Sequence, residues 1–310
     1  MRFATLANPS VPINFRQMAR AGIVTVIGKP NAGKSTFLNR VIGQKLSIIS
    51  AKPQTTRDRV VGIRTDGDVQ MVLFDTPGLL NPRYALQEAM RGIALQALAD
   101  ADVVLYLADA TDGPPPPLRE AAGGDARVTA PVITVLNKSD RLDGERQARL
   151  RAELPDARFI SALTGDGVEE LLRELGERLP ESPFLYPEDE ISTQTLRFFA
   201  SELVRETALE QLQDEVPYSV ACEIEEFRED RTPVYIRAVI YVERESQKGI
   251  LIGSKGARLR EIGRSARVKV EELVGAPVYL DLWVKVLPNW RRSASALRRF
   301  GFRLPGDNAR

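Results

Sequence analysis

The stretch GKPNAGKS, Gly28 to Ser35, decides the fold. It matches the pattern G-x-x-x-x-G-K-[ST], in which backbone N–H groups and a helix N-terminus face phosphate oxygens. An apolar run, residues 23–27, precedes it, and an amphipathic helical pattern, residues 35–43, follows it. The stretch predicts a phosphate-binding loop in which Lys34 contacts the β- and γ-phosphates and Ser35 binds Mg²⁺. The alternative is a glycine-rich turn without a ligand.

Three further short motifs each follow directly after an apolar run. They are DTPG (Asp75–Gly78), NKSD (Asn137–Asp140) and SAL (Ser161–Leu163). DTPG places Asp75 where a carboxylate orders Mg²⁺, and Gly78 beside the γ-phosphate. We therefore expect four successive strand ends to build one nucleotide site.

NKSD contains the side chains that select guanine. The Asp140 carboxylate can accept hydrogen bonds from both N1–H and N2–H₂ of guanine, and adenine lacks that pair of donors. Lys138 can lay its alkyl stem over the base, and Asn137 can tie this loop to the phosphate-binding loop. Backbone N–H groups of SAL can reach guanine O6.

The polar segment 51–59, AKPQTTRDR, contains the threonine expected to close over Mg²⁺ and the γ-phosphate. Thr56 is the preferred candidate and Thr55 the alternative. Leu79 and Leu80 follow Gly78, where many Ras-like enzymes carry a water-orienting glutamine. Hydrolysis should then depend on the phosphate-binding loop, Mg²⁺ and backbone groups, and be slow unaided. Asn31 lies where related GTPases bind a monovalent cation such as K⁺; the alternative is a turn-forming asparagine.

The chain changes its organisation near residue 180. Before it, apolar runs alternate with helical patterns, which predicts an α/β fold with a mostly parallel sheet and helices on both faces. One exception is the Asp66-Gly67 turn, which predicts a hairpin and an antiparallel strand. The expected division is an extension at 1–20, disordered; a nucleotide-binding domain at 21–181; a linker rich in proline and acidic residues at 182–194; and a second, α+β domain at 195–310.

The second domain carries GSKG, Gly253 to Gly256, before a helical pattern. The motif resembles the G-x-x-G loop of a KH domain, which clamps a single-stranded RNA backbone. The order helix, strand, strand, GSKG helix, helix, strand is that of a type-II KH domain. Residues 248–269 carry seven Lys and Arg against one acidic residue, and residues 285–310 have the same balance. These two segments predict a basic RNA-binding surface, and Trp290 either stacks on a base or packs inside.

Composition excludes several other chemistries. The 43 basic and 42 acidic residues nearly cancel, and the chain contains no histidine and one cysteine. Imidazole-dependent nucleophiles and His-bound zinc are therefore excluded, and Cys222 suits a reducing compartment. The amino terminus does not resemble a secretory signal, and no apolar run is long enough to cross a membrane. We expect a soluble intracellular protein.

Together, GKPNAGKS, QTTRD, DTPGL, NKSD, SAL and the GSKG tail resemble the bacterial Era-type GTPases. The resemblance implies a Ras-like G domain followed by a type-II KH domain, and GTP hydrolysis with GTP or GDP and Mg²⁺ as ligands. It also implies binding to the 3′ end of small-subunit ribosomal RNA during assembly and maturation of the 30S subunit. A monomer in the cytoplasm is expected, and peripheral association with the cell membrane is a further trait of the family.

The predicted functional residues follow the motifs. Lys34, Thr56 and Gly78 are the expected catalytic residues, and Ser35, Thr56 and Asp75 the expected metal ligands. The nucleotide should contact Gly28, Lys29, Pro30, Asn31, Ala32, Gly33, Lys34, Ser35, Thr36, Asp75, Thr76, Pro77, Gly78, Leu79, Asn137, Lys138, Asp140, Ser161, Ala162 and Leu163. RNA should contact Lys248, Gly253, Ser254, Lys255, Gly256 and Arg258.

Three other functions are compatible with parts of the sequence. An RNA-binding protein with an inactive G domain disagrees with the intact Lys34, Ser35, Asp75 and Asp140. A P-loop ATPase or kinase disagrees with NKSD. A GTPase of transfer RNA modification would lack the KH tail, and some of these enzymes use a catalytic cysteine.

Overall fold

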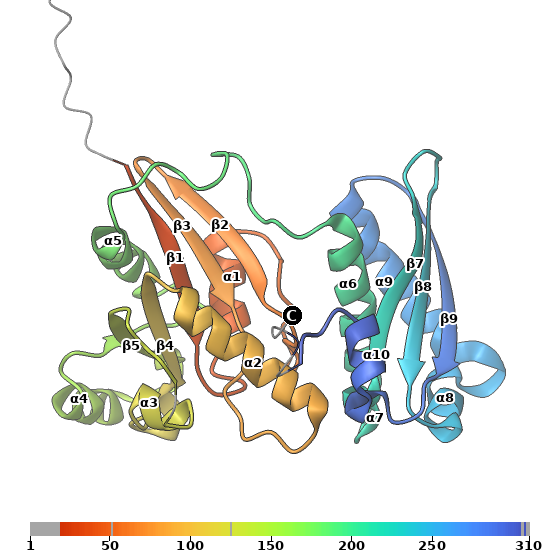
Figure 1. Cartoon of the computed structure of the whole chain (residues 1–310), viewed down its shortest axis with the longest axis horizontal. Coiled ribbons are helices and arrows are strands. Elements are labelled where there is room, and N and C mark those ends of the chain that lie inside the picture. Colours follow the sequence, from red (N-terminus) through yellow and green to blue (C-terminus); the bar gives the residue numbers. More distant parts are fainter. Residues whose placement is uncertain (1–18, 51, 125, 305–306, 308–310) are drawn as a thin grey trace, which may run out of the picture.

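Two β-sheets with separate helical covers form the described part of the chain, shown side by side in Figure 1. The computed structural model describes residues 19–50, 52–124, 126–304 and 307. The first sheet has the order β2-β3-β1-β4-β5-β6, and β2 is its antiparallel strand, as the Asp66-Gly67 turn predicts. Its strands are β1 (Arg20–Ile27), β2 (Val60–Asp66), β3 (Val69–Asp75), β4 (Val103–Asp109), β5 (Val132–Asn137) and β6 (Arg158–Phe159).

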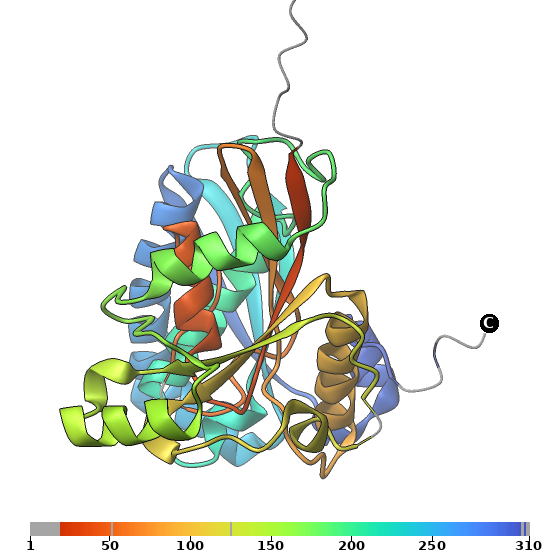
Figure 2. The ribbon, with the colours of Figure 1, turned by 90° about the vertical axis from the view of Figure 1, so that its left-hand side faces the viewer.

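Helices cover both faces of this sheet (Figure 2). One core joins the strands to α1 (Lys34–Ile42) and α5 (Val168–Arg178). The opposite face packs against α2 (Ala85–Asp100), α3 (Leu118–Ala121) and α4 (Gly144–Glu153). The strands are apolar on both faces because both are buried. Because β1, β3, β4 and β5 are parallel to one another, their carboxyl ends lie at one edge of the sheet, where the loops with polar motifs begin.

The second sheet has the order β7-β8-β9, with β7 antiparallel and β9 parallel to β8. Its elements are α6 (Leu196–Gln211), α7 (Val216–Ser219), β7 (Ala221–Arg228), β8 (Val234–Val242), α8 (Glu245–Ile252), α9 (Ala257–Val274), β9 (Val278–Val286) and α10 (Ala294–Arg299). Helices α6, α8 and α9 share one apolar core with one face of the sheet. This element order matches the predicted α+β half of the chain.

A separate apolar cluster joins the two halves. Leu86 and Met90 of α2 pack with Val239 and Tyr241 of β8 and with Trp290. Trp290 is fully buried, and its Nε1 donates a hydrogen bond to the Ser219 carbonyl at 2.8 Å. Of the two interpretations of this residue, packing is correct, because a ring without exposed surface cannot stack on a base.

The segment that connects the halves is bound to β2. Ile63 N–H donates to the Ile191 carbonyl at 2.8 Å, and the Ser192 hydroxyl donates to the Val61 carbonyl at 2.6 Å. The predicted linker thus covers the free edge of the first sheet, which would otherwise expose unpaired backbone groups. Residues 1–18 of the predicted extension lie outside the described residues, and the expectation of disorder is wrong for Arg20, which begins β1.

No helix in the described ranges combines the length and the apolar character that crossing a membrane requires.

We predict that Trp290→Ala lowers the free energy of unfolding by about 3–5 kcal/mol, because it empties a fully buried indole site. Trp283→Ala is the matched control, since Trp283 is 53% exposed on β9, and it should cost less than about 1 kcal/mol. Urea unfolding of both variants measures the difference. Equal costs would contradict the packing role of Trp290.

Candidate functional site

The phosphate-binding loop runs from the end of β1 into α1. Gly33 has φ +95°, and a Cβ there would lie 2.1 Å from Asn137 Nδ2, so the position requires glycine. Lys34 is 6% exposed, and its Nζ donates to the carbonyls of Lys29 at 3.0 Å and Gly28 at 3.3 Å. Burial lowers the pKa of the Lys34 ammonium to about 8, although the charge of Asp75 opposes this shift. The lysine is held at the N-terminus of α1, where phosphate binds.

Three predicted metal ligands meet beside this lysine. The Ser35 hydroxyl donates to Asp75 Oδ2 at 2.7 Å, and Thr56 Oγ1 lies 3.0 Å from Ser35 Oγ and 3.4 Å from Asp75 Oδ2. Asp75 is fully buried, burial raises the pKa of its carboxyl, and its Oδ1 has no partner among the described residues. Such a set of oxygens, with one left unpaired, fits Mg²⁺.

The structure separates the two candidate threonines. Thr56 lies in this cluster, whereas the Thr55 side chain is buried and donates to the Lys52 carbonyl at 2.6 Å. The geometry therefore favours Thr56 as the metal ligand.

A cleft of about 420 Å³ opens beside these side chains. Its lining includes Lys34, Ser35, Thr56, Gly78 and Lys138, so it reaches from the metal cluster to NKSD. This volume is within the usual range for a small-ligand site.

NKSD and SAL are joined to the phosphate-binding loop by one side chain. Asn137 Nδ2 donates to the Ala32 carbonyl at 2.8 Å, which is the tie that the sequence predicts. Asn137 Oδ1 accepts from the Ala162 N–H, also at 2.8 Å. The Ser161 N–H donates to the Asp166 carbonyl. Two of the three SAL N–H groups thus donate to acceptors of the chain itself, and the contact of SAL with guanine O6 stays a prediction.

The base-reading side chains occupy the turn after β5. Asp140 is exposed in this turn, and Lys138 has φ +65°, which is a left-handed backbone conformation. Lys138 Nζ forms an ion pair with Asp109 Oδ2 at 2.6 Å, which fixes the direction of its alkyl stem. Asp109 also accepts from the N–H and hydroxyl of Thr111.

Two residues with a positioning role are missing from the sequence prediction. Asp109 ends β4, so the strand-end argument that found the other motifs could have found it too. Arg40 lies on α1, where its Nε donates to the Ala162 carbonyl at 2.6 Å and its Nη2 donates to the Leu163 carbonyl. No local pattern marks Arg40, because its partners lie more than 120 residues away.

The residues near the expected attacking water offer no side-chain base. Leu79 packs in the core with Ile27 and Tyr106, and its N–H donates to the Gly28 carbonyl at 2.9 Å. Thr76 is buried, and its hydroxyl donates to the Val26 carbonyl. Asn31 is exposed with φ +63°, the conformation of a turn-forming asparagine.

GSKG forms a tight turn between α8 and α9. Gly253 has φ +71° and ψ 176°, a conformation open to glycine alone, and a Cβ there would lie 2.8 Å from Arg258 Cβ. Gly256 has φ +76° and precedes the first residue of α9, so the loop leads into the N-terminus of an 18-residue helix. Ser254, Lys255 and Arg258 are exposed, and Lys248 is half-buried on α8.

The predicted basic surface is smaller than the sequence count indicates. In the C-terminal segment, Lys285, Arg291, Arg298 and Arg299 form ion pairs with Glu225, Glu243, Asp307 and Glu223. Three of these pairs join the segment to acidic residues on or next to the second sheet, and the fourth, Arg298 with Asp307, lies inside the segment. Its charge is therefore neutralised in part, and Arg292 and Arg303 are exposed without an ion pair among the described residues. Around GSKG, Lys255, Arg258 and Arg260 are exposed and have no ion pair among the described residues.

Comparison with known proteins agrees with this geometry. The family of 50S ribosome-binding GTPases matches residues 23–138, and the KH domain family matches residues 215–291. The GTPase Era of Carboxydothermus hydrogenoformans is 43% identical over 91% of this chain and 98% of its own length. The GTPase Era of Ectopseudomonas mendocina is 43% identical over 92% of this chain and 98% of its own length.

Two solved structures are similar over nearly the whole chain. An Aquifex aeolicus Era variant bound to GDP and AlF₄⁻ has a TM-score of 0.85 at 41% identity, over 92% of this chain and 100% of that one. An Era complex with MgGDPNP and nucleotides 1506–1542 of 16S ribosomal RNA has a TM-score of 0.85 at 40% identity, with the same coverage.

We predict that Asp140→Asn weakens GTP binding at least about tenfold, because the amide cannot accept from both guanine donors. The same change should improve binding of xanthosine triphosphate, whose C2 oxygen can accept from the new amide. Asp143→Asn is the control, since Asp143 caps the next helix and asparagine caps equally well. Affinities for both nucleotides measure the switch, and an unchanged ratio would contradict base reading by NKSD.

We predict that Lys34→Met raises the free energy of unfolding of the nucleotide-free protein by about 1–3 kcal/mol at pH 7, because it removes a buried charge. The gain should shrink above pH 8, since native Lys34 then loses its proton while the unfolded lysine keeps it. GTP turnover should fall at least about a hundredfold. Urea unfolding between pH 7 and 9.5 measures the stability.

Lys29→Met is the control for stability, because Lys29 is exposed in the same loop. If the Lys34→Met protein is no more stable than the Lys29→Met protein at pH 7, burial of the Lys34 charge does not destabilise the nucleotide-free protein.

Proposed function

Because the chain belongs to the family of Era GTPases, we propose that it couples GTP hydrolysis to binding of the 3′ end of small-subunit ribosomal RNA. The chain hydrolyses GTP with Mg²⁺ as its cofactor. The proposed setting is assembly of the 30S subunit and maturation of its RNA. The observation that carries the GTPase part is the meeting of Ser35, Thr56 and Asp75 beside Lys34 at the N-terminus of α1.

The proposed mechanism depends on position and charge. When bound, Mg²⁺ neutralises charge that develops on the phosphates. Ser35 and Thr56 would hold it directly, and the unpaired Oδ1 of Asp75 would hold its water. Lys34 would contact the β- and γ-phosphate oxygens, and Gly78 N–H would hold the γ-phosphate end. No side chain beside Gly78 can orient water, so we expect slow unaided turnover.

The RNA part of the proposal has two supports. One solved relative binds nucleotides 1506–1542 of 16S ribosomal RNA. In this chain, GSKG has the backbone geometry and the helix N-terminus that phosphate binding needs. We propose that Lys248, Gly253, Ser254, Lys255, Gly256 and Arg258 contact that RNA.

We also propose the limits of the domains: a G domain at 21–181, a linker at 182–194 and a KH domain at 195–310. K⁺ beside Asn31 would raise turnover relative to Na⁺ if a monovalent cation is bound there. The protein would act in the cytoplasm as a monomer. Peripheral membrane association would appear as sedimentation of the protein with vesicles.

We predict that Gly256→Asp lowers the affinity for single-stranded RNA at least about tenfold, or roughly 1.4 kcal/mol, because it places a negative charge beside phosphate. The added Cβ would meet only Arg260, at 3.7 Å, so the protein should fold. The remaining binding should depend less steeply on salt, since fewer phosphate contacts release fewer counterions. GTP turnover should persist.

Gly275→Asp is the matched control for this variant. Gly275 ends the same helix with φ +71° and ψ 17°, close to the 76° and 15° of Gly256, and a Cβ there would meet nothing within 4 Å. RNA affinity of the Gly275→Asp protein should stay within about twofold of the natural chain. Equal RNA binding by both variants would contradict the KH assignment.

A further inference from the structure

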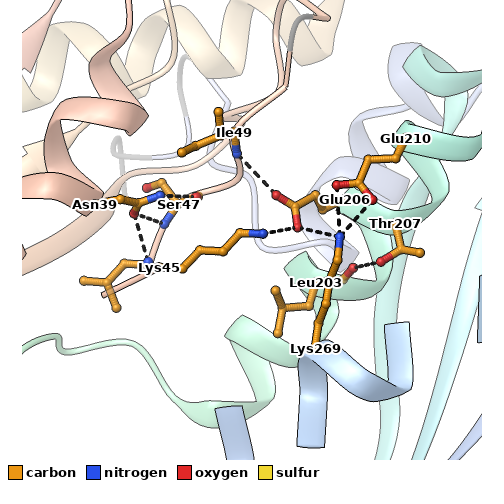
Figure 3. A network of polar contacts seen from close by, with 10 residues as sticks. Asn39, Lys45, Ser47, Ile49, Leu203, Glu206, Thr207, Glu210 and Lys269 are labelled. Carbon is orange, nitrogen blue, oxygen red and sulfur yellow. Dashed lines mark hydrogen bonds and ion pairs between the residues drawn. The ribbon is translucent and has the colours of Figure 1, made fainter. Parts of the chain in front are cut away.

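Residues 45–50 and 52–57, here called the switch segment, lead to Thr56 and lie against the second half of the chain. Glu206 of α6 is 1% exposed on its side chain and accepts from Lys45 Nζ at 2.6 Å and from Ile49 N–H at 3.3 Å (Figure 3). It also pairs with Lys269 of α9 at 3.1 Å. The beginning of the switch segment is therefore fastened to a buried carboxylate that belongs to another domain.

The middle of the switch segment is bound at the C-terminus of the same helix. Lys52 Nζ donates to the carbonyls of Leu209 and Leu212, the latter at 2.5 Å. Carbonyls at the end of a helix lack partners within the helix and attract cations. Helix α6 thus contacts the switch segment along its length.

The two residues next to Thr56 are both anchored by a guanidinium: Arg205 bonds the carbonyl of Thr55, and Arg57 is held through its own side chain. Arg205 of α6 is 3% exposed, and its Nη2 donates to the Thr55 carbonyl at 2.7 Å. Arg57 is 8% exposed and donates to the carbonyls of Val220 at 2.6 Å and Tyr218 at 3.0 Å. The Arg57 guanidinium also lies 5.5 Å from the centre of the Trp290 ring.

These contacts restrict the switch threonine itself. Glu202 orients Arg205 through bonds of 2.8 and 2.5 Å, so the guanidinium that reaches Thr55 has little freedom. Removing two guanidinium groups from water is costly unless their donors find acceptors. For Arg57 the acceptors are backbone carbonyls of the second half, and for Arg205 they are the Glu202 carboxylate and the Thr55 carbonyl. Arg205 Nη1 has no partner among the described residues, so the loss of the Thr55 contact would leave this buried group still less satisfied. If the Thr55–Arg57 backbone moved, both arginines would lose their carbonyl partners, so the contacts hold Thr56 toward Ser35 and Asp75.

We propose that Arg57 and Arg205 are positioning residues for GTP hydrolysis, which hold Thr56 in the Mg²⁺ site by fixing the backbone on both sides of it. Helix α6 of the second domain then completes the GTPase site of the first. The inference rests on the proposed role of Thr56. Neither arginine is among the residues that line the cleft, so each would act through Thr56.

The test compares Arg205→Ala with Thr56→Ala and with Arg197→Ala. Arg197 is the matched control, because it lies on the same helix and also donates to backbone carbonyls, those of Ile224 and Glu225, within its own domain. The measurements are kcat and KM for GTP, the Mg²⁺ concentration at half-maximal rate, and calorimetric affinities for GDP and for GDPNP with Mg²⁺.

Arg205→Ala should lower kcat at least about tenfold and weaken GDPNP binding about fivefold, while GDP affinity stays within about twofold. The Mg²⁺ requirement should rise. The double variant with Thr56→Ala should be no slower than Thr56→Ala alone, because both changes remove one interaction. Arg197→Ala should stay within about twofold of the natural chain in every measurement.

Arg57→Lys is the second variant and keeps the charge. Lysine offers one nitrogen in place of the separate Nη1 and Nη2 that donate to Val220 and Tyr218, so kcat should fall about threefold, again with GDP affinity retained. If the Arg205→Ala protein fails to fold, the kcat and GDP affinity of the Arg57→Lys protein test the positioning role.

The outcomes separate the inference from the proposed function. If Thr56→Ala leaves turnover and Mg²⁺ dependence unchanged, the metal-binding role of Thr56 is wrong, and the inference is wrong with it. If Thr56→Ala is impaired but Arg57→Lys and a folded Arg205→Ala match Arg197→Ala, the function stands and the inference is overturned. Additive losses in the double variant would also overturn it.

Discussion

The buried pair of Lys34 and Asp75 constrains everything at the phosphate end of the cleft. Asp75 ends β3, where it is in register with Val26 of the parallel strand β1, and Lys34 begins α1 after the loop that follows β1. Opposite charges in such a place destabilise a fold unless their polar atoms are all paired. Lys34 has two carbonyl partners, but Asp75 Oδ1 has none among the described residues. Phosphates and Mg²⁺ are the partners that would complete the set, so these residues serve binding at a cost to the nucleotide-free fold.

The amide of Asn137 connects this phosphate end to the base end. Its two atoms bond to the loops after β1 and β6, and its position leaves room only for glycine at Gly33. Three loops that are distant in sequence are thereby held as one unit. Arg40 adds a second connection from α1 to the SAL loop. Discrimination between bases consequently depends on the same backbone positions that cradle phosphate.

The sequence predicts those parts of the site that can be recognised from residues next to one another in the chain. A strand run followed by DTPG or NKSD places its polar residues at one edge of the sheet, whatever the rest of the chain does. Asp109 follows the same rule and was missed only because one aspartate is no motif. Arg57 and Arg205 differ, because their acceptors lie about 150 residues away in the chain and no spacing reveals them. Trp290 is similar: its burial depends on α2, which belongs to the other domain.

Charge shows most clearly why a count along the chain is a poor guide to a surface. Arg299 pairs with Glu223, 76 residues away in the chain, and Lys285 pairs with Glu225, 60 residues away. These acidic partners on β7 offset part of the positive charge of the C-terminal segment. In the GSKG loop and the first turn of α9, Lys255, Arg258 and Arg260 are exposed and have no ion pair among the described residues, and the same is true of Arg292 and Arg303 in the C-terminal segment. A G-x-x-G loop accommodates a short stretch of single strand, so the first group of cations lies where such a stretch would bind.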